Sequence, residues 1–189
     1  MKAAIIKRVT IYSIDYSKEK LEGEYTKICF DHCDFSEVAF GDIQFEDCQF
    51  IACNLSLCKS YGTSWSNVSF DGCKMTGINF SNANRFTYRA GFKDCQLQYA
   101  SFHALNLQGT LFDKCQLEEV DFTGCILKKA VFNECELVRA EFSQCNLEYA
   151  DFVTARGYLI NPSENRISHA RFSRYGLAGL LTTFRIEIV

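Results

Sequence analysis

Eleven cysteines and three histidines are the side chains of this sequence with the widest chemical repertoire. Grouped thiols and imidazoles bind zinc or act as nucleophiles, and thiols of secreted chains pair as disulfides. Here the number of cysteines is odd, no CxxC pair occurs, and His32, His103 and His169 form no cluster. Most cysteines instead recur at intervals of twenty residues: Cys33, Cys53 and Cys73; Cys95, Cys115 and Cys135; Cys125 and Cys145. This spacing predicts a structural role for the thiols, with no catalytic residue, no cofactor and no metal site.

Large apolar residues recur every five positions, in two blocks that differ in register. A smaller residue lies two positions before each large one, and ten of the eleven cysteines occupy this small position. Cys29 falls on an outward position instead, and Ser60 is the one failure at a large position. The large residues are Phe30, Phe35, Phe40, Phe45, Phe50, Leu55, Trp65, Phe70, Met75 and Phe80, and then Phe92, Leu97, Phe102, Leu107, Phe112, Leu117, Phe122, Leu127, Phe132, Leu137, Phe142, Leu147 and Phe152.

A period of five fits neither a helix, with 3.6 residues per turn, nor a strand, with a period of two. It fits a chain that turns a corner every five residues, with two apolar side chains pointing inward and three residues facing water. The twenty-residue spacing of the cysteines then corresponds to four sides per coil. Most phenylalanines follow a small residue and many leucines follow a cysteine, which keeps the core volume nearly constant. We therefore predict an all-β solenoid in which each column of equivalent residues stacks on one side.

Several repeats carry a clear family resemblance: Cys33-Asp34-Phe35, Val120-Asp121-Phe122, Cys145-Asn146-Leu147 and Ala150-Asp151-Phe152. They match the A(D/N)LXX motif, and over residues ~23 to 172 the chain resembles the pentapeptide-repeat proteins. The resemblance implies a right-handed quadrilateral β-helix with coils ~4.8 Å apart, the distance between paired strands.

A narrower resemblance is to the bacterial branch that confers resistance to topoisomerase poisons. That branch includes the Qnr quinolone-resistance proteins, the mycobacterial fluoroquinolone-resistance protein, and the albicidin and microcin immunity proteins. The length near 190 residues, the core rich in Phe and Cys, and the C-terminal segment from Asn161-Pro162 through His169-Ala170-Arg171-Phe172-Ser173 support it. It implies a partner, DNA gyrase or topoisomerase IV, that is recognised by mimicry of DNA.

The departures from the repeat divide the chain into five segments. Residues 1–22 form an N-terminal cap with a strand-like stretch from Val9 to Ile14, and residues 23–80 form the first repeat block. Residues 81–91 are a loop with a register insertion, residues 92–172 form the second block, and residues 173–189 form a C-terminal helix and strand. Leu177, Leu180, Leu181 and Phe184 follow a helical spacing, and Ile186 and Ile188 alternate as in a strand. In the family this end packs against its own copy, which implies a homodimer; a monomeric cap folded on the last coil is the alternative.

The loop contains two residues more than the repeat allows, because Phe80 and Phe92 lie twelve positions apart instead of ten. Asn84, Arg85, Phe86, Tyr88 and Arg89 are its candidate contact residues, since arginine and aromatic side chains are enriched where proteins bind one another. The resemblance also implies that such a projecting loop contacts the topoisomerase. A bulge that only absorbs the change of register is the alternative.

Charge is distributed unevenly along the chain, whose net charge is −3. Residues 28–152 carry 17 acidic and 9 basic residues, whereas residues 1–27 and 153–189 carry net charges of +2 and +3. An acidic rod disfavours direct nucleic-acid binding and favours a partner with a basic groove. The acidic residues that we select for this role are Asp31, Asp34, Glu37, Asp42, Glu46, Asp47, Asp71, Asp121 and Glu141. Ordinary solubility of the coil would also explain them.

Three classes of function remain. The first is a topoisomerase-binding protein that protects against a quinolone or a toxin, and the second is a scaffold for another protein. An enzyme is disfavoured, because a filled coil offers no pocket in which titratable groups converge. No apolar run approaches the ~20 residues that span a membrane, and the stretch from Ala3 to Ile6 is too short for a signal-peptide core. We therefore expect a cytoplasmic protein that does not associate with membranes.

Overall fold

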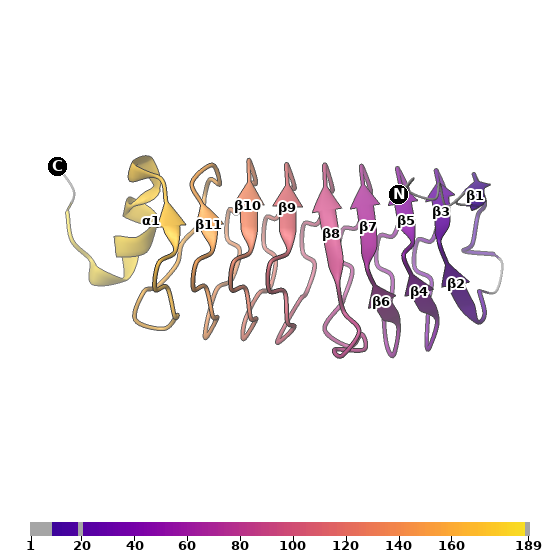
Figure 1. Cartoon of the computed structure of the whole chain (residues 1–189). Coiled ribbons are helices and arrows are strands. Elements are labelled where there is room, and N and C mark those ends of the chain that lie inside the picture. Colours follow the sequence, from indigo (N-terminus) through magenta and orange to yellow (C-terminus); the bar gives the residue numbers. More distant parts are fainter. Residues whose placement is uncertain (1–8, 19–20, 188–189) are drawn as a thin grey trace, which may run out of the picture.

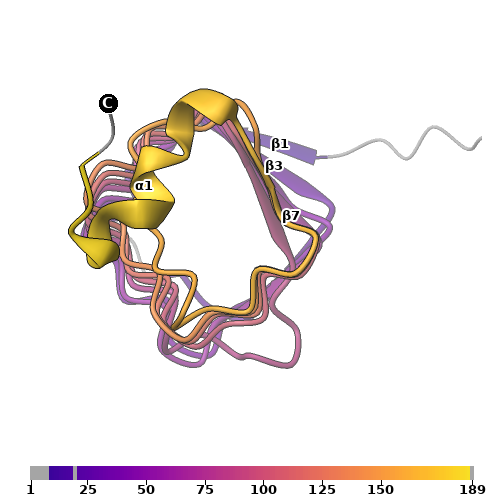
Figure 2. The same cartoon turned by 90° about the vertical axis from the view of Figure 1, so that its left-hand side faces the viewer.

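The computed structural model describes residues 9–18 and 21–187, which wind into a right-handed quadrilateral β-solenoid of about eight turns. In Figure 1 the coils stand side by side along one axis, with the short helix α1 (Ala178–Leu181) at the C-terminal end. Along that axis the coils superimpose in a four-sided outline (Figure 2). Within the described ranges, no helix combines the length and the apolar character needed to cross a bilayer.

One side of the coil is a parallel sheet of nine strands, in the order β1-β3-β5-β7-β8-β9-β10-β11-β12. Facing residues of neighbouring strands are usually twenty positions apart, as in the pairing of Phe30 with Phe50 and of Phe50 with Phe70. The predicted columns therefore form through in-register pairing of successive coils. The strands are β1 (Val9–Tyr12), β3 (Ile28–Asp31), β5 (Gln49–Ile51), β7 (Val68–Asp71), β8 (Ala90–Lys93), β9 (Leu111–Asp113), β10 (Val131–Asn133), β11 (Asp151–Phe152) and β12 (Arg171–Phe172).

The other three sides pair over shorter stretches. A second parallel sheet joins β2 (Glu24–Thr26), β4 (Gln44–Glu46) and β6 (Ser64–Ser66). The remaining sides are held by isolated bridges between successive coils, for example Asp34 with Asn54 and Ala39 with Lys59. Each side is only a few residues long because the chain turns at every fifth residue.

Many corners use the left-handed region of φ, which side chains other than glycine rarely occupy. One corner column contains Leu57 (φ 59°), Gly77 (φ 68°) and Tyr99 (φ 61°). The Leu57 amide donates to the Thr76 carbonyl at 3.0 Å, and the Gly77 amide donates to the Gln98 carbonyl at 2.9 Å. The hydrogen bonds of each corner to the next coil thus offset its unfavourable backbone conformation.

Stacked phenylalanine rings fill the core along two sides of the second block. The rings of Phe92 and Phe112 have centroids 5.2 Å apart and an interplanar angle of 3°, and Phe112 stacks on Phe132 in the same way. A second stack, which includes Phe102 and Phe122, meets the first edge to face. Phe and Leu alternate at the large positions from 92 to 152, so they separate into columns of rings and columns of aliphatic side chains.

All eleven cysteines are buried thiols, and none forms a disulfide. Most of these thiols donate to backbone carbonyls of the preceding coil, as from Cys53 to Phe30 at 3.4 Å and from Cys73 to Phe50 at 3.4 Å. The structural role predicted for the thiols is therefore confirmed. The outward position predicted for Cys29 is wrong as a statement of exposure, because its side chain is only 7% exposed. Cys29 lies in register between Thr10 and Gln49, and this small side chain is shielded by its neighbours on both sides.

At the N-terminal end, residues 9–16 continue the coil. β1 pairs with β3 from Val9 opposite Ile28 to Tyr12 opposite Asp31. The Tyr16 ring stacks on Phe35 at 4.7 Å with an interplanar angle of 7°. Within the segment predicted as a cap, this part therefore adds a turn to the solenoid and extends its aromatic core.

The C-terminal end departs from the predicted helix and strand. The helical stretch is split into the 3₁₀ turn η1 (Arg174–Gly176), α1, and the 3₁₀ turn η2 (Thr182–Phe184). Arg185 then adopts a left-handed φ of 51°, which ends the helical turns. The strand predicted through Ile186 and Ile188 is wrong for residues 185–187, which find no neighbouring strand to pair with in the described part of the chain. Ile188 lies outside the described residues.

Candidate protein-interaction surface

The largest departure from the repeat is the segment between β7 and β8. Val68 pairs with Ala90 and Phe70 with Phe92, so this coil has 22 residues, whereas Phe50 and Phe70 are separated by twenty. The two extra residues leave the sheet register intact on both sides. In Figure 2 the segment that precedes β8 projects beyond the outline of the other coils.

Backbone hydrogen bonds fix both ends of this loop to the preceding coil. The Asn84 amide donates to the Thr63 carbonyl at 2.9 Å, and the Arg89 amide donates to the Trp65 carbonyl at 2.7 Å. Between these points, the Asn84 side chain accepts from the Phe86 amide at 3.1 Å. The loop is therefore a defined turn with an anchored base.

The five predicted loop residues divide into three roles. Arg85, Phe86 and Arg89 are exposed, and the Phe86 side chain is 100% exposed. Asn84 is exposed as well, but its side chain holds the turn. Tyr88 corrects the prediction, since it is 8% exposed and its ring packs edge to face on Phe80 at 5.6 Å.

Burial of Tyr88 leaves its hydroxyl without a hydrogen-bond partner among the described residues and raises its pKa well above the ordinary value. The sequence does contain a signal for this orientation. Tyr88 lies two residues before Ala90 and four before Phe92, both of which are buried, so all three share one face of an extended strand. The side chain is therefore part of the core.

A polar hollow of about 600 Å³ lies beside the loop. We call it the loop notch. Its lining includes Ser66, Asn67, Arg85, Arg89, Asn106 and Gln108, and contains no carboxylate. The side-chain amide of Asn67 donates to Asp47, at 2.6 Å, so one acidic residue of the preceding coil lies behind this wall.

The predicted acidic residues do not form one stripe. Glu46 lies on β4 and Asp71 on β7, whereas Asp34 lies on a third side and Asp121 on the fourth. Glu37, Asp42 and Glu46 are exposed, whereas Asp31, Asp34, Asp47, Asp71 and Asp121 are partly buried. The predicted stacking of Asp121 and Glu141 is confirmed, because these residues bridge successive coils.

Some of these carboxylates have structural partners. Asp34 accepts from the Ser36 amide at 2.8 Å, and its hydrogen bonds with Ser36 and Asn54 lower its pKa. Lys93 pairs with Asp71 at 3.2 Å, and the imidazole of His103 lies 3.5 Å from Asp121. These groups are therefore less available to a partner than the exposed acids.

Acidic charge is concentrated in the first coils. Residues 28–58 contain six acidic and no basic residues, whereas residues 59–152 contain eleven acidic and nine basic ones. In the second block, arginines pair with carboxylates of the preceding coil, as in Arg171 with Asp151 at 2.7 Å and Arg166 with Glu148 at 2.6 Å. Hydrogen bonds from Lys128 and Arg166 lower the pKa of Glu148. The second block is thus nearly neutral on its surface.

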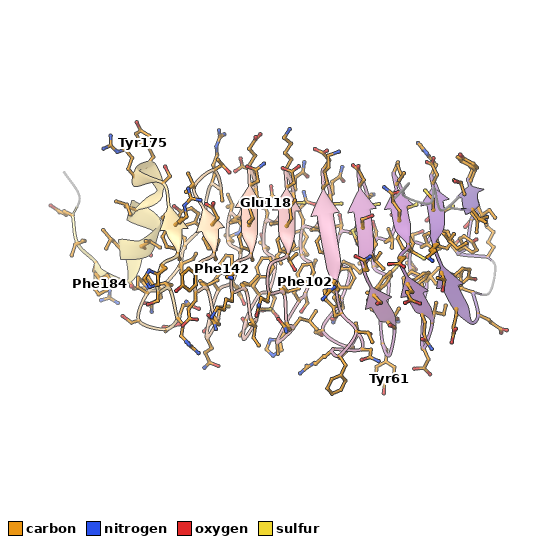
Figure 3. All side chains as sticks on the ribbon, viewed as in Figure 1. Tyr61, Phe102, Glu118, Phe142, Tyr175 and Phe184 are labelled. Atoms are coloured by element: carbon orange, nitrogen blue, oxygen red, sulfur yellow. The ribbon has the colours of Figure 1, made fainter. Side chains whose placement is uncertain are left out.

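The C-terminal end exposes apolar side chains of the predicted dimer element. Leu177, Phe184 and Ile186 are each about half exposed, Leu181 is partly buried, and Leu180 packs against the core. Figure 3 shows Phe184 and Tyr175 at this end of the rod, beyond the last coil, whereas Phe102 and Phe142 lie along the coil. A hollow of about 680 Å³ lies beside the contact between the last coil and the cap.

The cap docks on the buried ring and backbone of Tyr158. A Cβ atom at Gly176 would lie 2.0 Å from the Tyr158 hydroxyl oxygen, and one at Gly179 would lie 2.2 Å from the Tyr158 carbonyl oxygen. The Ile160 amide donates to the Gly179 carbonyl at 3.0 Å. These two glycines therefore allow the close approach that holds the cap on the coil.

No group of three His, Cys, Asp or Glu side chains suited to a metal ion occurs within the described residues. The surface features of the described residues are acidic first coils, a projecting loop with arginine and phenylalanine, and an apolar C-terminal end.

Solved structures with a similar chain path include two structures of QnrB1 and one of HetL. Full-length QnrB1, a plasmid-mediated fluoroquinolone resistance protein, is 16% identical, with 95% of this chain and 100% of that chain covered and a TM-score of 0.49. A trypsin-treated variant of QnrB1 is 20% identical over 96% and 98% of the two chains, with a TM-score of 0.48. HetL from the cyanobacterium Nostoc, involved in heterocyst differentiation regulation, is 15% identical over 89% and 88%, with a TM-score of 0.43.

Curated protein sequences contain no significant match to this chain. The family described as "Pentapeptide repeat region" does match, over residues 24–102, 43–122, 63–142 and 95–180. These overlapping matches cover both repeat blocks and run into the C-terminal cap. The chain therefore belongs to the pentapeptide-repeat family.

Proposed function

We propose that this chain is a non-enzymatic, DNA-mimicking protein that binds DNA gyrase or topoisomerase IV and protects it from poisoning by a quinolone or a toxin. It acts in the cytoplasm, where it occupies the basic groove that otherwise holds DNA. The resemblance of the sequence to the topoisomerase-protecting branch motivates the choice of partner. The charge of the first coils supports the mode of binding.

The observation that carries the proposal is the density of acidic charge between Ile28 and Cys58. Six net negative charges lie within these 31 residues, about one and a half coils. At ~4.8 Å per coil this is roughly one charge per 1.2 Å of axis, compared with about one per 1.7 Å in duplex DNA. None of the six forms an ion pair with a lysine or arginine of the described residues. The linear charge density of residues 28–58 is therefore at least as high as that of duplex DNA.

The coils that follow have a much lower density, because the net charge is only −2 over residues 59–152. We therefore propose that the N-terminal coils enter the basic groove and that the loop contacts its wall. The apolar C-terminal end points away, where Leu177, Phe184 and Ile186 pack against a second copy. A homodimer of this kind presents an acidic rod at each end.

Competition with DNA tests this arrangement. Fluorescence anisotropy of a labelled duplex on gyrase would be measured during titration with the purified protein. Replacing three exposed acids of the first coils, Glu37→Gln, Asp42→Asn and Glu46→Gln, should weaken displacement about tenfold or more. The matched control removes three acids from the second block, Asp94→Asn, Glu134→Gln and Glu141→Gln, and should change it less than about twofold. Equal losses in both variants would contradict a DNA-like N-terminal rod.

A scaffold for another protein is the second candidate function, and three exposed side chains with large apolar surfaces favour it. Leu57, Tyr61 and Tyr99 are each more than half exposed, and contacts through such side chains need no charge complementarity. Salt dependence separates the two candidates. Binding through the acidic coils should weaken steeply as salt rises, whereas binding through Leu57, Tyr61 and Tyr99 should change little.

A further inference from the structure

Two arginines of the loop differ from the other arginines of the solenoid. Arg139, Arg156, Arg166 and Arg171 each form an ion pair with a carboxylate of the preceding coil. No such pair forms between Arg85 or Arg89 and an acidic side chain anywhere in residues 9–18 and 21–187. Both guanidinium groups are exposed. Their charge is therefore not balanced within the coil.

These two arginines line the loop notch together with hydrogen-bonding side chains. Asn106 and Gln108 come from the following coil, and Ser66 and Asn67 come from the preceding one. The hydroxyl of Ser64 donates to the hydroxyl of Thr87 at 2.8 Å, which ties the loop to β6. The notch is thus a donor-rich hollow with an anchored wall, and its two arginines have no acidic partner among the described residues.

We infer that the loop notch binds a carboxylate side chain from an acidic segment of the protein partner. A guanidinium group makes strong, often bidentate hydrogen bonds to a carboxylate. Phe86, which is fully exposed beside the notch, supplies an apolar contact to the same segment. This inference rests on the proposed role of the chain as a protein-binding module, but it does not require that the partner is a topoisomerase.

The acidic charge of the first coils favours a protein segment over nucleic acid as the ligand of the loop notch. A duplex lying across the notch would bring many phosphates against the six acids of residues 28–58, none of which pairs with a lysine or arginine of the described residues. A protein segment with one or two local carboxylates touches the notch alone. The partner surface that we expect is therefore mixed: a basic groove for the first coils, and an acidic patch bordering it for the loop.

An NMR titration of the isolated protein tests the notch directly. The probe is a short peptide with four glutamates around a leucine, compared with the same peptide carrying glutamines. The glutamate peptide should shift the amide signals of residues 66–67, 85–89 and 106–110, with a dissociation constant on the order of millimolar. The glutamine peptide should not shift them. Shifts spread evenly over the basic ends of the chain would overturn the inference, as would preferential binding of a short DNA duplex at the notch.

Matched variants separate the notch from charge in general. Arg85→Gln with Arg89→Gln should abolish the peptide shifts, whereas Arg156→Gln with Arg171→Gln removes the same charge and should leave them unchanged. Against a bound partner, each loop arginine should account for about a tenfold change in affinity. If the peptide binds the notch while gyrase does not bind the protein, the notch stands and the proposed partner is wrong. If gyrase binds and both arginine pairs behave alike, the notch is wrong and the proposed partner stands.

Discussion

Trp65 fills the space that Ser60 leaves in the core. Both side chains occupy inward positions of the same coil, and Ser60 is the small residue where the repeat calls for a large one. The indole of Trp65 lies edge to face against Phe40 at 5.5 Å and against Phe80 at 5.8 Å. These two rings belong to the side of the coil on which Ser60 interrupts the phenylalanine column. The repeat is thus locally broken in sequence, while the core volume is kept.

This compensation predicts that restoring the repeat destabilises the protein. Ser60→Phe should lower the free energy of unfolding by about 1–3 kcal/mol, because the added ring overpacks the space that the indole holds. Ser60→Phe combined with Trp65→Leu should be more stable than the sum of the two single effects predicts. Urea unfolding of the four proteins measures the coupling. Stabilisation by Ser60→Phe alone would show that the space is empty.

The two aromatic residues of the loop should behave in opposite ways. Phe86→Ala should leave the free energy of unfolding within about 0.5 kcal/mol of the wild type, because the ring is fully exposed. Tyr88→Ala should lower it by about 3–5 kcal/mol, because the ring is buried against Phe80. Phe86→Ala should lower the affinity for the partner while the stability of the protein stays the same. Equal effects of the two substitutions on stability would refute this assignment.

Docking of the C-terminal cap should depend on Gly179. A Cβ at this position would lie 2.2 Å from the Tyr158 carbonyl oxygen, so Gly179→Ala should displace the cap and cost about 1–3 kcal/mol. Hydrogen exchange of the Ile160 amide reports the loss, because that amide donates to Gly179. Ala178→Ser, at an exposed neighbouring position, is the control. Unchanged hydrogen-exchange protection of Ile160 in Gly179→Ala would contradict the packing of the cap on Tyr158. Sedimentation of the same variant tests whether the proposed dimer needs the docked cap.

Stability should fall in alkaline solution because of buried thiols. Burial raises the pKa of Cys58 and Cys125 to about 12 and that of Cys145 to about 11, from an ordinary value of 9.0. The unfolded chain therefore releases these protons at lower pH than the folded chain. Their contribution is complete below pH 9 and is lost as the pH rises from about 9 to 12, by up to about 1.4 kcal/mol per pH unit for each thiol.

Urea unfolding between pH 8 and pH 11 measures this loss. Replacing Cys58, Cys125 and Cys145 with alanine should make the decline shallower, since tyrosines and lysines that titrate in the same range remain in both proteins. An identical slope in the wild type and the triple variant would show that these thiols ionise alike in the folded and unfolded chains.

The regular part of the fold follows from the sequence because each pentad places its residues in the same way. The five-residue period gives the corners, and the twenty-residue period gives the sides and the columns that stack Phe92 on Phe112. The burial of Tyr88 was not predicted. The loop has two extra residues, so the five-residue period does not specify which of its side chains return to the inward position. Cys29 was misjudged since its shielding comes from strands twenty residues away.

Asn165 shows a different limit. It occupies a buried position where the repeat expects a small apolar residue, yet its amide donates to the Phe142 carbonyl at 2.8 Å and accepts from the Cys145 amide at 2.8 Å. Its side chain thus replaces backbone hydrogen bonds in the irregular coil that follows Asn161-Pro162. Such a role depends on two residues in another coil, which the local pattern does not specify. The C-terminal helix was predicted as one unit, whereas the structure divides it into η1, α1 and η2.

The central claim, protection of a topoisomerase by an acidic rod, is tested most directly by a gyrase supercoiling assay. The purified protein would be titrated into reactions with and without ciprofloxacin or albicidin. We expect restored supercoiling in the poisoned reaction, with about tenfold more protein required when Glu37, Asp42 and Glu46 are neutralised. Absence of rescue, of inhibition at high protein concentration and of binding to the enzyme would contradict the account and leave a scaffold for a different protein partner.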